Sequence, residues 1–391
     1  MTAKSRNLLV GFMVFCAMVL LTSLKNMPVP VYSSTVESVG DSTEYYIDQV
    51  SPDWELMKNR VKVKGIYMTG YTVGSADRFN KLIDLVKTTE LNAVVIDVKD
   101  DTGLMTYSSE LPDVAFTGAN KKVRIKDIDA VMKVLRENNI YAIARIVTFK
   151  DRVAGDKYAN LAVKNNSGGI WRDRHGMSWL NPYNKESWDY LVDIAEEAAI
   201  KGFDEIQFDY VRFPTDGNVK IIDYGKSAAG KSKAEAIAEF LAYARDRLRN
   251  MGVVVSADVF GLVTTTKDDM HIGQHLESIA KSVDVICPMV YPSHYGKGSY
   301  GVAEPDFEPY KIVNRSMSVA KGRIAAVEGA AQKAILRPWL QDFTASYLPR
   351  YKKYGPAEVK AQIKATYDAG AEEWLLWNAG NRFTAGALDK E

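Results

Sequence analysis

The stretch FDEIQFDYVRFP, residues 203–214, reads as a buried β-strand that ends in charge. Its apolar members are β-branched or aromatic, as is typical of packed strands. An acid, Asp209, and a base, Arg212, occupy its last third, where burying a charge is costly unless the charge is paired. We therefore expect a core strand over Glu205–Arg212 whose end carries either a structural ion pair or a catalytic carboxylate.

Similar apolar runs recur along the chain and alternate with segments of helical periodicity. The expected strands are Val63–Thr69, Ala93–Lys99, Tyr141–Val147, Glu205–Arg212, Val253–Phe260, Val285–Tyr291, Ala334–Leu340 and Glu373–Trp377. The expected helices are Asp77–Thr89, Lys126–Asn138, Lys185–Lys201, Lys233–Asn250, Ile272–Ser282, Tyr310–Ala320 and Pro356–Ala369. Eight strands separated by seven helices predict an α/β fold of the (β/α)8 TIM-barrel type.

A doubly wound open sheet is the alternative arrangement of the same elements. That fold commonly binds a nucleotide at a glycine-rich turn after its first strand. Residues 69–75, TGYTVGS, contain no GxGxxG pattern, and the chain has no GxxxxGK[ST] motif. The sequence therefore favours the barrel and argues against a nucleotide site.

The charge balance bears on partners. The 391 residues hold 50 Lys and Arg against 49 Asp and Glu, which gives a formal net charge of +1. A nucleic-acid-binding domain normally carries a marked excess of basic residues. We therefore expect no nucleic acid partner.

The N-terminus resembles an export signal. Lys4 and Arg6 precede an apolar run over 8–24, and no small-residue cleavage site follows directly. We expect residues 1–25 to form a signal-anchor or transmembrane segment with its basic flank inside, a cleaved secretion signal being the alternative. Residues 26–60 then form a stalk or linker, and residues 61–391 form an extracytoplasmic barrel anchored to the cell membrane.

Polar and aromatic residues follow the predicted strands, at the end of a barrel where catalytic groups lie. Carboxylates and arginines beside flat aromatic rings suit a sugar, which offers both hydroxyls and C–H faces. The candidate substrate-binding residues are Asp97, Lys99, Arg145, Arg212, Tyr291, His294, Trp339, Gln341, Asp342, Trp377 and Asn378.

Asp209 is the candidate nucleophile, and a buried ion pair with Arg145 or Arg212 is the alternative interpretation. Glycoside cleavage by the usual route needs a second carboxyl group as proton donor. Asp258 occupies the end of the next strand, and neighbouring strands lie about 4.8 Å apart. Asp97, Asp100 and Asp342 are rivals for the proton donor.

Other chemistries find less support. His271 and His275 have i, i+4 spacing without the HExxH pattern, so no metal is expected, and no cofactor is required. The absence of GxSxG leaves acyl transfer without a motif. Trp171 and Trp179, in the loop after the third strand, are either sugar-stacking platforms or residues buried under that loop.

Seven segments together carry a family resemblance. They are KGIYMTGY, NAVVIDVKDDTG, FDEIQFDYVRFP, VSADVFG, ICPMVYPSHY, RPWLQDF and WLLWNAGN. Over residues 62 to 385 the chain resembles the bacterial family of glycoside-hydrolase-like proteins with a barrel domain formerly of unknown function. This family looks related to α-amylase-like and α-galactosaminidase-like barrels, and that resemblance implies Asp209 as nucleophile and Asp258 as proton donor.

Residues and resemblance together predict a retaining glycosidase that cleaves α-linked cell-wall or extracellular polysaccharide. In this hypothesis Arg145, Arg212 and Tyr291 orient Asp209 or bind sugar hydroxyls. A non-catalytic carbohydrate-binding or wall-associated protein on a barrel scaffold is the alternative, because a fold does not by itself imply a function.

Overall fold

The computed structural model describes residues 52–329 and 333–390 of the chain. The predicted anchor, residues 1–25, lies outside the described residues, as does most of the predicted linker. Within the described ranges, no helix is both long enough and apolar enough to cross a membrane. The membrane anchor therefore stays a prediction.

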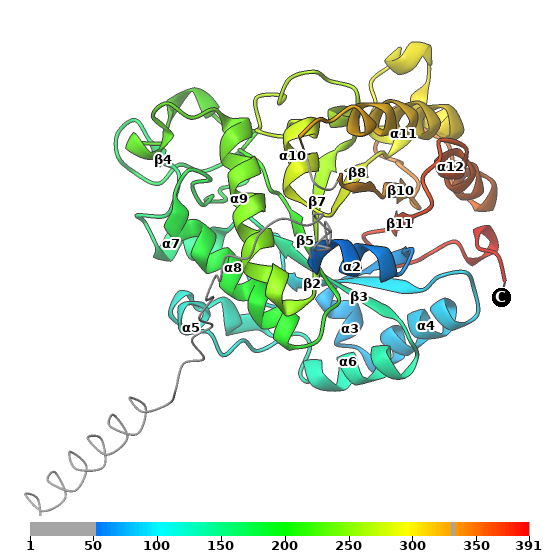
Figure 1. Ribbon diagram of the computed structural model, residues 1–391, viewed down its shortest axis with the longest axis horizontal. Coiled ribbons are helices and arrows are strands. Elements are labelled where there is room, and N and C mark those ends of the chain that lie inside the picture. The colour runs from blue at the N-terminus through cyan, green and yellow to red at the C-terminus, as the bar shows by residue number, and fades with distance from the viewer. Residues whose placement is uncertain (1–51, 330–332, 391) are drawn as a thin grey trace, which may run out of the picture. The chain divides into compact units, whose positions relative to one another are not determined.

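Parallel strands form a closed barrel at the centre of the domain (Figure 1). The strands are β1 (Lys64–Met68), β2 (Ala93–Lys99), β3 (Tyr141–Val147), β5 (Glu205–Asp209), β7 (Val254–Phe260), β8 (Val285–Met289), β9 (Ile335–Leu336), β10 (Trp339–Gln341) and β11 (Trp374–Trp377). Their order is β10-β11-β1-β2-β3-β5-β7-β8-β9, and a pairing of β10 with β8 closes the ring. The predicted (β/α)8 barrel is confirmed. A separate antiparallel pair, β4 (Lys164–Asn165) and β6 (Ile222–Asp223), lies in the loops.

The seventh strand position is split between β9 and β10, where the sequence predicted one strand over Ala334–Leu340. Pro338 lies at the break and has no backbone N–H to donate to a ladder. β9 pairs with β8, whereas Trp339 of β10 pairs with both β8 and β11. The break therefore lets β10 close the barrel.

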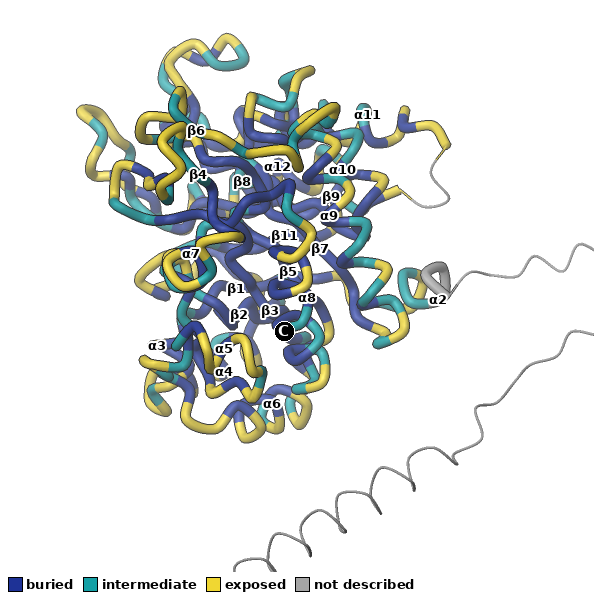
Figure 2. The backbone as a smooth tube through the Cα atoms, turned by 90° about the vertical axis from the view of Figure 1, so that its left-hand side faces the viewer, coloured by how far each residue is buried: buried dark blue, intermediate teal, exposed yellow. Residues whose placement is uncertain are grey.

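All seven predicted helices are present around the strands. They are α4 (Ala76–Lys87), α6 (Ile128–Glu137), α8 (Lys185–Ile200), α9 (Lys233–Leu248), α10 (Leu276–Ser282), α11 (Pro309–Ala325) and α12 (Pro356–Asp368). Shorter helices are α2 (Pro52–Asn59), α3 (Gly70–Val73), α5 (Pro112–Thr117) and α7 (Arg152–Lys157). Figure 2 shows the strands buried at the centre and the helices exposed on their outer sides.

Several predicted boundaries differ from those of the structure: α11 runs on to Ala325 instead of ending at Ala320, and two other differences have a backbone cause. The helix expected from Ile272 begins at Leu276, because Met270, His271 and Gly273 adopt positive φ values of 53°, 57° and 83° that a right-handed helix excludes. The strand expected to reach Arg212 ends at Asp209, since the next residue leaves the β region.

The apolar core has two layers. The larger cluster fills the space between the outer face of the strands and the helices. The smaller one lies inside the barrel and includes Tyr67, Val95, Ile143, Cys287 and Trp339. Alternate strand residues face opposite sides of a sheet, so each strand supplies both layers.

The amino ends of the strands are closed by buried charge. Arg337 is fully buried, with its Nη2 2.9 Å from Oε2 of Glu205 and its Nε 3.3 Å from Oε2 of Glu373. Arg60 also donates to Glu373, at 2.9 Å from Nη1 to Oε2. Side chains of α2, within the predicted linker, pack against the barrel interior at the same end. This network leaves the carboxyl ends of the strands as the open end.

Candidate active site

A polar and aromatic cavity of about 300 Å³ lies at the carboxyl ends of the strands. It is lined by Arg145, Asp209, Tyr210, Arg212, Asp258, Phe260, Met289, Tyr291, His294, Trp339 and Trp377. These residues come from β3, β5, β7, β8, β10 and β11 or from the loops that follow them. Barrel enzymes build their active sites at this end of the strands.

A second cavity, of about 420 Å³, lies at the amino end of the barrel. Arg60 and Lys62 in its wall already pair with Glu373 and Glu372. The cavity at the carboxyl ends is the better candidate, although it is smaller, because it combines two carboxyl groups with aromatic rings at the end of the barrel where active sites lie.

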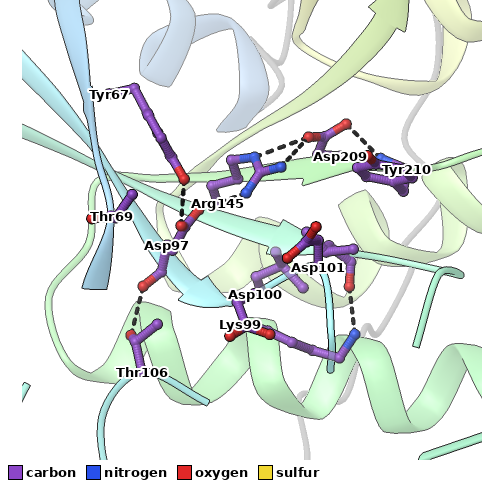
Figure 3. Close-up of polar contacts among 12 residues, drawn as sticks. Tyr67, Thr69, Asp97, Lys99, Asp100, Asp101, Thr106, Arg145, Asp209 and Tyr210 are labelled. Carbon is purple, nitrogen blue, oxygen red and sulfur yellow. Dashed lines mark hydrogen bonds and ion pairs between the residues drawn. The ribbon is translucent and has the colours of Figure 1, made fainter. Parts of the chain in front are cut away.

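A chain of hydrogen bonds links four strands beneath this cavity (Figure 3). The hydroxyl of Tyr67 donates to Oδ2 of Asp97 at 2.5 Å, and Nη1 of Arg145 donates to Oδ1 of Asp97 at 2.6 Å. Nε of Arg145 donates to Oδ2 of Asp209 at 2.9 Å, and its Nη2 bonds to the same oxygen. Arg145 therefore holds Asp209 in place from the neighbouring strand.

The other oxygen of Asp209 is held by the backbone. The N–H of Tyr210 donates to Oδ1 of Asp209 at 2.6 Å. Tyr210 has a φ of 50°, in the left-handed region that residues other than glycine seldom adopt. Such backbone strain is often found at functional sites. The turn fixes the Asp209 carboxylate on both of its oxygens.

Asp258 lies on β7 and is only 2% exposed. Its Oδ1 accepts a hydrogen bond of 2.7 Å from Nε1 of Trp339. Burial is the main reason that the pKa of Asp258 lies well above its usual range, and the charge of Asp209 raises it further. The Trp339 bond and Arg145 act in the opposite direction and are the weaker influences. These surroundings favour the protonated form of Asp258 more than in an ordinary aspartate.

Asp209 and Asp258 occupy the same level of adjacent strands. Phe208 and Ala257, the residues just before them, are partners in the register of β5 with β7. Both aspartates line the same cavity, and strands in a sheet are about 4.8 Å apart. The barrel therefore brings together the two carboxyl groups that the sequence singled out.

Aromatic rings form one wall of the cavity. The rings of Tyr67 and Trp377 stack at 4.1 Å between centroids, and Trp339 meets Trp377 edge to face at 5.6 Å. On the other side, Tyr291 lies beside His294 and Phe343. Burial lowers the pKa of His294, which favours the neutral imidazole at neutral pH. These rings offer flat apolar surfaces next to the carboxyl groups.

An apolar cavity of about 390 Å³ adjoins the polar one. It shares Phe260, Met289, Tyr291 and His294 with the polar cavity and adds residues from the loops after β7 and β8. The combined space is therefore polar beside β3 and β5 and apolar beside β7 and β8.

Five predicted substrate-binding residues, Asp97 among them, do not line the cavity. Lys99 is fully buried beside Oδ2 of Asp151, at 2.8 Å. Gln341 accepts from the N–H of Ser293 and donates to neighbouring loops. Asp342 accepts from Thr384, and Asn378 donates to the carbonyl of Asp342. These side chains hold the loops around the site. Asp97 reaches the site through Arg145.

The site residues predicted from the sequence did not include Tyr210, Phe260 and Met289, which line the cavity, or Tyr67, which bonds to Asp97 beneath it. Tyr67 is the inward-facing aromatic residue of the first strand, so the period-two pattern alone could have indicated it. Phe260 and Met289 end their strands, and apolar residues at such positions carry no signal that separates a cavity wall from core.

The loop tryptophans are buried, and His275 has structural contacts. Trp171 and Trp179 are 2% and 1% exposed, so of the two readings of these residues burial under the loop is confirmed. Nδ1 of His275 lies 2.8 Å from Oγ of Ser278, and its Nε2 lies 3.2 Å from Glu277. Over residues 52–329 and 333–390, no three His, Cys, Asp or Glu side chains are grouped so that they could hold a metal ion.

A parallel barrel with two carboxyl groups and aromatic walls at the carboxyl ends of its strands has the architecture of barrel glycoside hydrolases. The chain belongs to the family described as "Putative glycosyl hydrolase domain", whose model matches residues 65–383. The family predicted from the sequence is confirmed. No curated protein matches the chain.

Several solved structures resemble the barrel. The glycoside hydrolase domain of PgaB from Bordetella bronchiseptica has a TM-score of 0.58 and 15% identity, covering 81% of this chain and 94% of that one. A C-terminal domain of a chitinase-like protein from Desulfitobacterium hafniense has a TM-score of 0.50 and 12% identity, covering 84% and 95%. A hypothetical protein from Ruminiclostridium thermocellum is 50% identical over 50% of this chain and 97% of its own, with a TM-score of 0.45. At these identities the first two show a shared fold.

Proposed function

We propose that this protein is a retaining glycoside hydrolase with Asp209 as nucleophile and Asp258 as acid and base. One observation carries the proposal: two carboxyl groups on adjacent strands share a cavity but have opposite surroundings. Arg145 donates two hydrogen bonds to Asp209, whereas Asp258 is buried, with a raised pKa and an indole as its hydrogen-bond donor. Environments that separate two carboxyl groups in this way assign them different roles in proton transfer.

In the first step the Asp209 carboxylate attacks the anomeric carbon, and the bond from that carbon to the leaving oxygen breaks. Asp258 gives its proton to the leaving oxygen and becomes a carboxylate. In the second step a water molecule attacks the glycosyl ester of Asp209 and gives its proton back to Asp258. Two inversions at the anomeric carbon retain its configuration.

Adjacent strands support the retaining route over the inverting one. Retaining enzymes place their carboxyl groups about 5–5.5 Å apart, whereas inverting enzymes need about 6.5–9.5 Å to admit a water molecule. Side chains at one level of neighbouring strands start about 4.8 Å apart. Trp377, Trp339 and Tyr291 supply apolar faces against which a sugar ring can pack.

The proposed substrate is an α-linked cell-wall or extracellular polysaccharide. The resemblance to α-amylase-like barrels supports the α linkage. The N-terminal apolar segment, with Lys4 and Arg6 before it, supports a place outside the cytoplasm, anchored to the membrane. Both are proposals that follow from the sequence.

The test uses the full-length protein with a panel of bacterial wall and capsule polysaccharides. Release of reducing ends by the parent and its loss in Asp209→Asn would support a glycosidase. Asp101→Asn is the matched control, because Asp101 is an exposed aspartate near the same end of the barrel and outside the cavity. NMR of the first product formed would give the anomer and so separate retention from inversion.

Azide distinguishes the nucleophile from a merely structural aspartate. In Asp209→Ala, azide can attack the anomeric carbon in place of the missing carboxylate, which would give a glycosyl azide of inverted configuration. If neither parent nor variant releases reducing ends but both bind a polysaccharide, the protein is a carbohydrate-binding protein and the proposed chemistry is wrong.

A further inference from the structure

Arg212 is a buried cation in the wall of the cavity, and no carboxylate of the described residues forms an ion pair with it. Its side chain is only 7% exposed, and its Nη1 donates to the carbonyl of Phe213 at 2.9 Å. A longer contact of 3.5 Å reaches Oγ1 of Thr215. A guanidinium group has five N–H donors, so most of its donating capacity is not used by these contacts.

The other buried cations of the described residues are all paired with carboxylates. Arg145 pairs with Asp97 and Asp209, Arg337 with Glu205 and Glu373, and Lys99 with Asp151. Within residues 52–329 and 333–390, Arg212 is the exception among the four Lys and Arg residues that are buried as whole residues. Burying an unpaired charge is costly.

Three aromatic rings surround the guanidinium group. Its Cζ lies 5.0 Å from the ring centroid of Trp179, 5.1 Å from that of Tyr210 and 4.9 Å from that of Phe260. Cation–π contacts of this kind stabilise a cation but leave its N–H groups without acceptors. The rings therefore fix the position of Arg212 and do not neutralise it.

Three acids lie near Arg212; Asp216 forms no ion pair with it among the described residues, and the other two are engaged elsewhere. Asp209 already accepts from Arg145 on one oxygen and from the N–H of Tyr210 on the other. Asp173 accepts from Nε1 of Trp179 at 3.1 Å and from two backbone N–H groups of its own loop. Burial lowers the pKa of Arg212 despite the charges of these acids. An anion that enters the cavity would therefore meet a cation that is already desolvated and held in place.

We propose that Arg212 recognises a carboxylate on the sugar that binds beside Asp209, so that the preferred substrate is an acidic sugar polymer. The inference rests on the proposed function and deepens it. A planar guanidinium fork matches a carboxylate with two parallel hydrogen bonds, which adds direction as well as affinity. A hydroxyl-bearing neutral sugar would leave the charge of Arg212 unmatched.

The test compares each acidic polysaccharide with its own carboxyl-reduced derivative, in which a CH2OH group replaces the carboxylate and the linkage is unchanged. Polygalacturonate and its reduced form are a defined α-linked pair, and the acidic members of the wall and capsule panel are treated in the same way. Binding and release of reducing ends are measured for the full-length parent, Arg212→Gln and Arg212→Lys. Arg172→Gln is the control, because Arg172 is a more exposed arginine paired with Asp156, outside the cavity.

We expect the parent to prefer the acidic form of at least one pair by about tenfold or more, the size of one charge-assisted contact. Arg212→Gln should lose that preference while still accepting the reduced form, and Arg172→Gln should keep it. Arg212→Lys should keep part of it, since lysine retains the charge without the fork. Thermal unfolding of each variant checks that it is folded. If Arg212→Gln does not fold, Arg212→Lys alone tests whether the preference for the acidic form depends on Arg212.

Three results would overturn the assignment. The first is equal use of acidic and reduced forms by the parent across all pairs. The second is a preference that survives in Arg212→Gln. The third is a preference for dextran sulfate over dextran, combined with no preference for any acidic polysaccharide over its carboxyl-reduced form. That result would make sulfate the ligand. Failure to bind or cleave any carbohydrate, acidic or neutral, would instead reject the glycoside hydrolase itself.

Discussion

The indole Nε1 of Trp339 donates a hydrogen bond of 2.7 Å to Oδ1 of Asp258. The two residues lie on β10 and β7, which do not pair with each other, so the bond crosses the end of β8 inside the barrel. Because Oδ1 is occupied, Oδ2 is the oxygen available to exchange a proton with a substrate. The rotamer of the candidate acid is thus fixed by a side chain from β10, on the far side of β8.

Replacing Trp339 by phenylalanine should move the alkaline limb of the rate profile to higher pH. The indole bond favours the charged form of Asp258, so its loss raises the pKa of this carboxyl group further. Hydrogen bonds to charged groups contribute about 1.5–3 kcal/mol, and one pH unit is about 1.4 kcal/mol, so a shift of about one unit is expected. The measurement is kcat/KM against pH. Trp377→Phe is the control. An alkaline limb that moves to lower pH in Trp339→Phe would contradict this role of the indole.

Asp258→Asn should make the protein more stable above acidic pH although it removes activity. The raised pKa of Asp258 means that the folded state binds a proton that the unfolded state releases. That contribution to stability is complete below the unfolded pKa of about 3.9 and is lost as pH rises through the folded pKa. Asparagine does not titrate, so the variant does not lose this contribution as pH rises.

Urea unfolding at several pH values tests this prediction. The free energy of unfolding of the parent, relative to Asp258→Asn, should fall as pH rises above about 4. Asp101→Asn, at an exposed position, should follow the parent. A variant that is less stable than the parent at neutral pH would show that a charged Asp258 stabilises the fold.

Arg145→Met should strongly destabilise the protein. Removing this guanidinium leaves Asp97 and Asp209 buried with no cation, and breaking a buried ion pair costs about 3–5 kcal/mol. Arg152→Met should cost no more than about 1 kcal/mol, because Arg152 is 58% exposed and forms a long surface pair. Chemical unfolding at neutral pH compares the two. Similar losses in both variants would mean that the Arg145 network contributes no more than a surface pair.

Gly261→Ala should destabilise the wall of the apolar cavity. A Cβ at Gly261 would lie 2.5 Å from both the carbonyl oxygen of Met289 and the hydroxyl of Tyr295. Overpacking of this kind costs about 1–3 kcal/mol. Gly296→Ala meets nothing within 4 Å and should be neutral or slightly stabilising. Thermal unfolding of the pair measures the difference, and an unchanged Gly261→Ala would mean that the backbone moves freely there.

The sequence alone determined the order of elements and much of the site. Strand and helix periodicities indicated a barrel, and the rule that functional groups follow the strands selected Arg145, Asp209, Asp258, Trp339 and Trp377, which line one cavity. Local patterns could supply this much because side-chain alternation and chain order are properties of short segments.

Tertiary structure decided which polar residues turn toward the cavity. Lys99 lies two positions after Asp97 and would share its face in a regular strand. Between these residues the register of β2 against β3 shifts by one, so Lys99 faces Asp151 outside the barrel. No local pattern announces such a bulge, because it depends on the partner strand.

The same holds at the end of β5. The positive φ of Tyr210 ends the strand at Asp209, yet Arg212 still reaches the cavity, inside a cage of rings from three different segments. The sequence determined that an acid, Asp209, and a base, Arg212, lie at the end of this strand. Only the packing of distant segments decided that Asp209 forms its ion pair with Arg145 and not with Arg212, because the pairing of buried charges depends on distances in space.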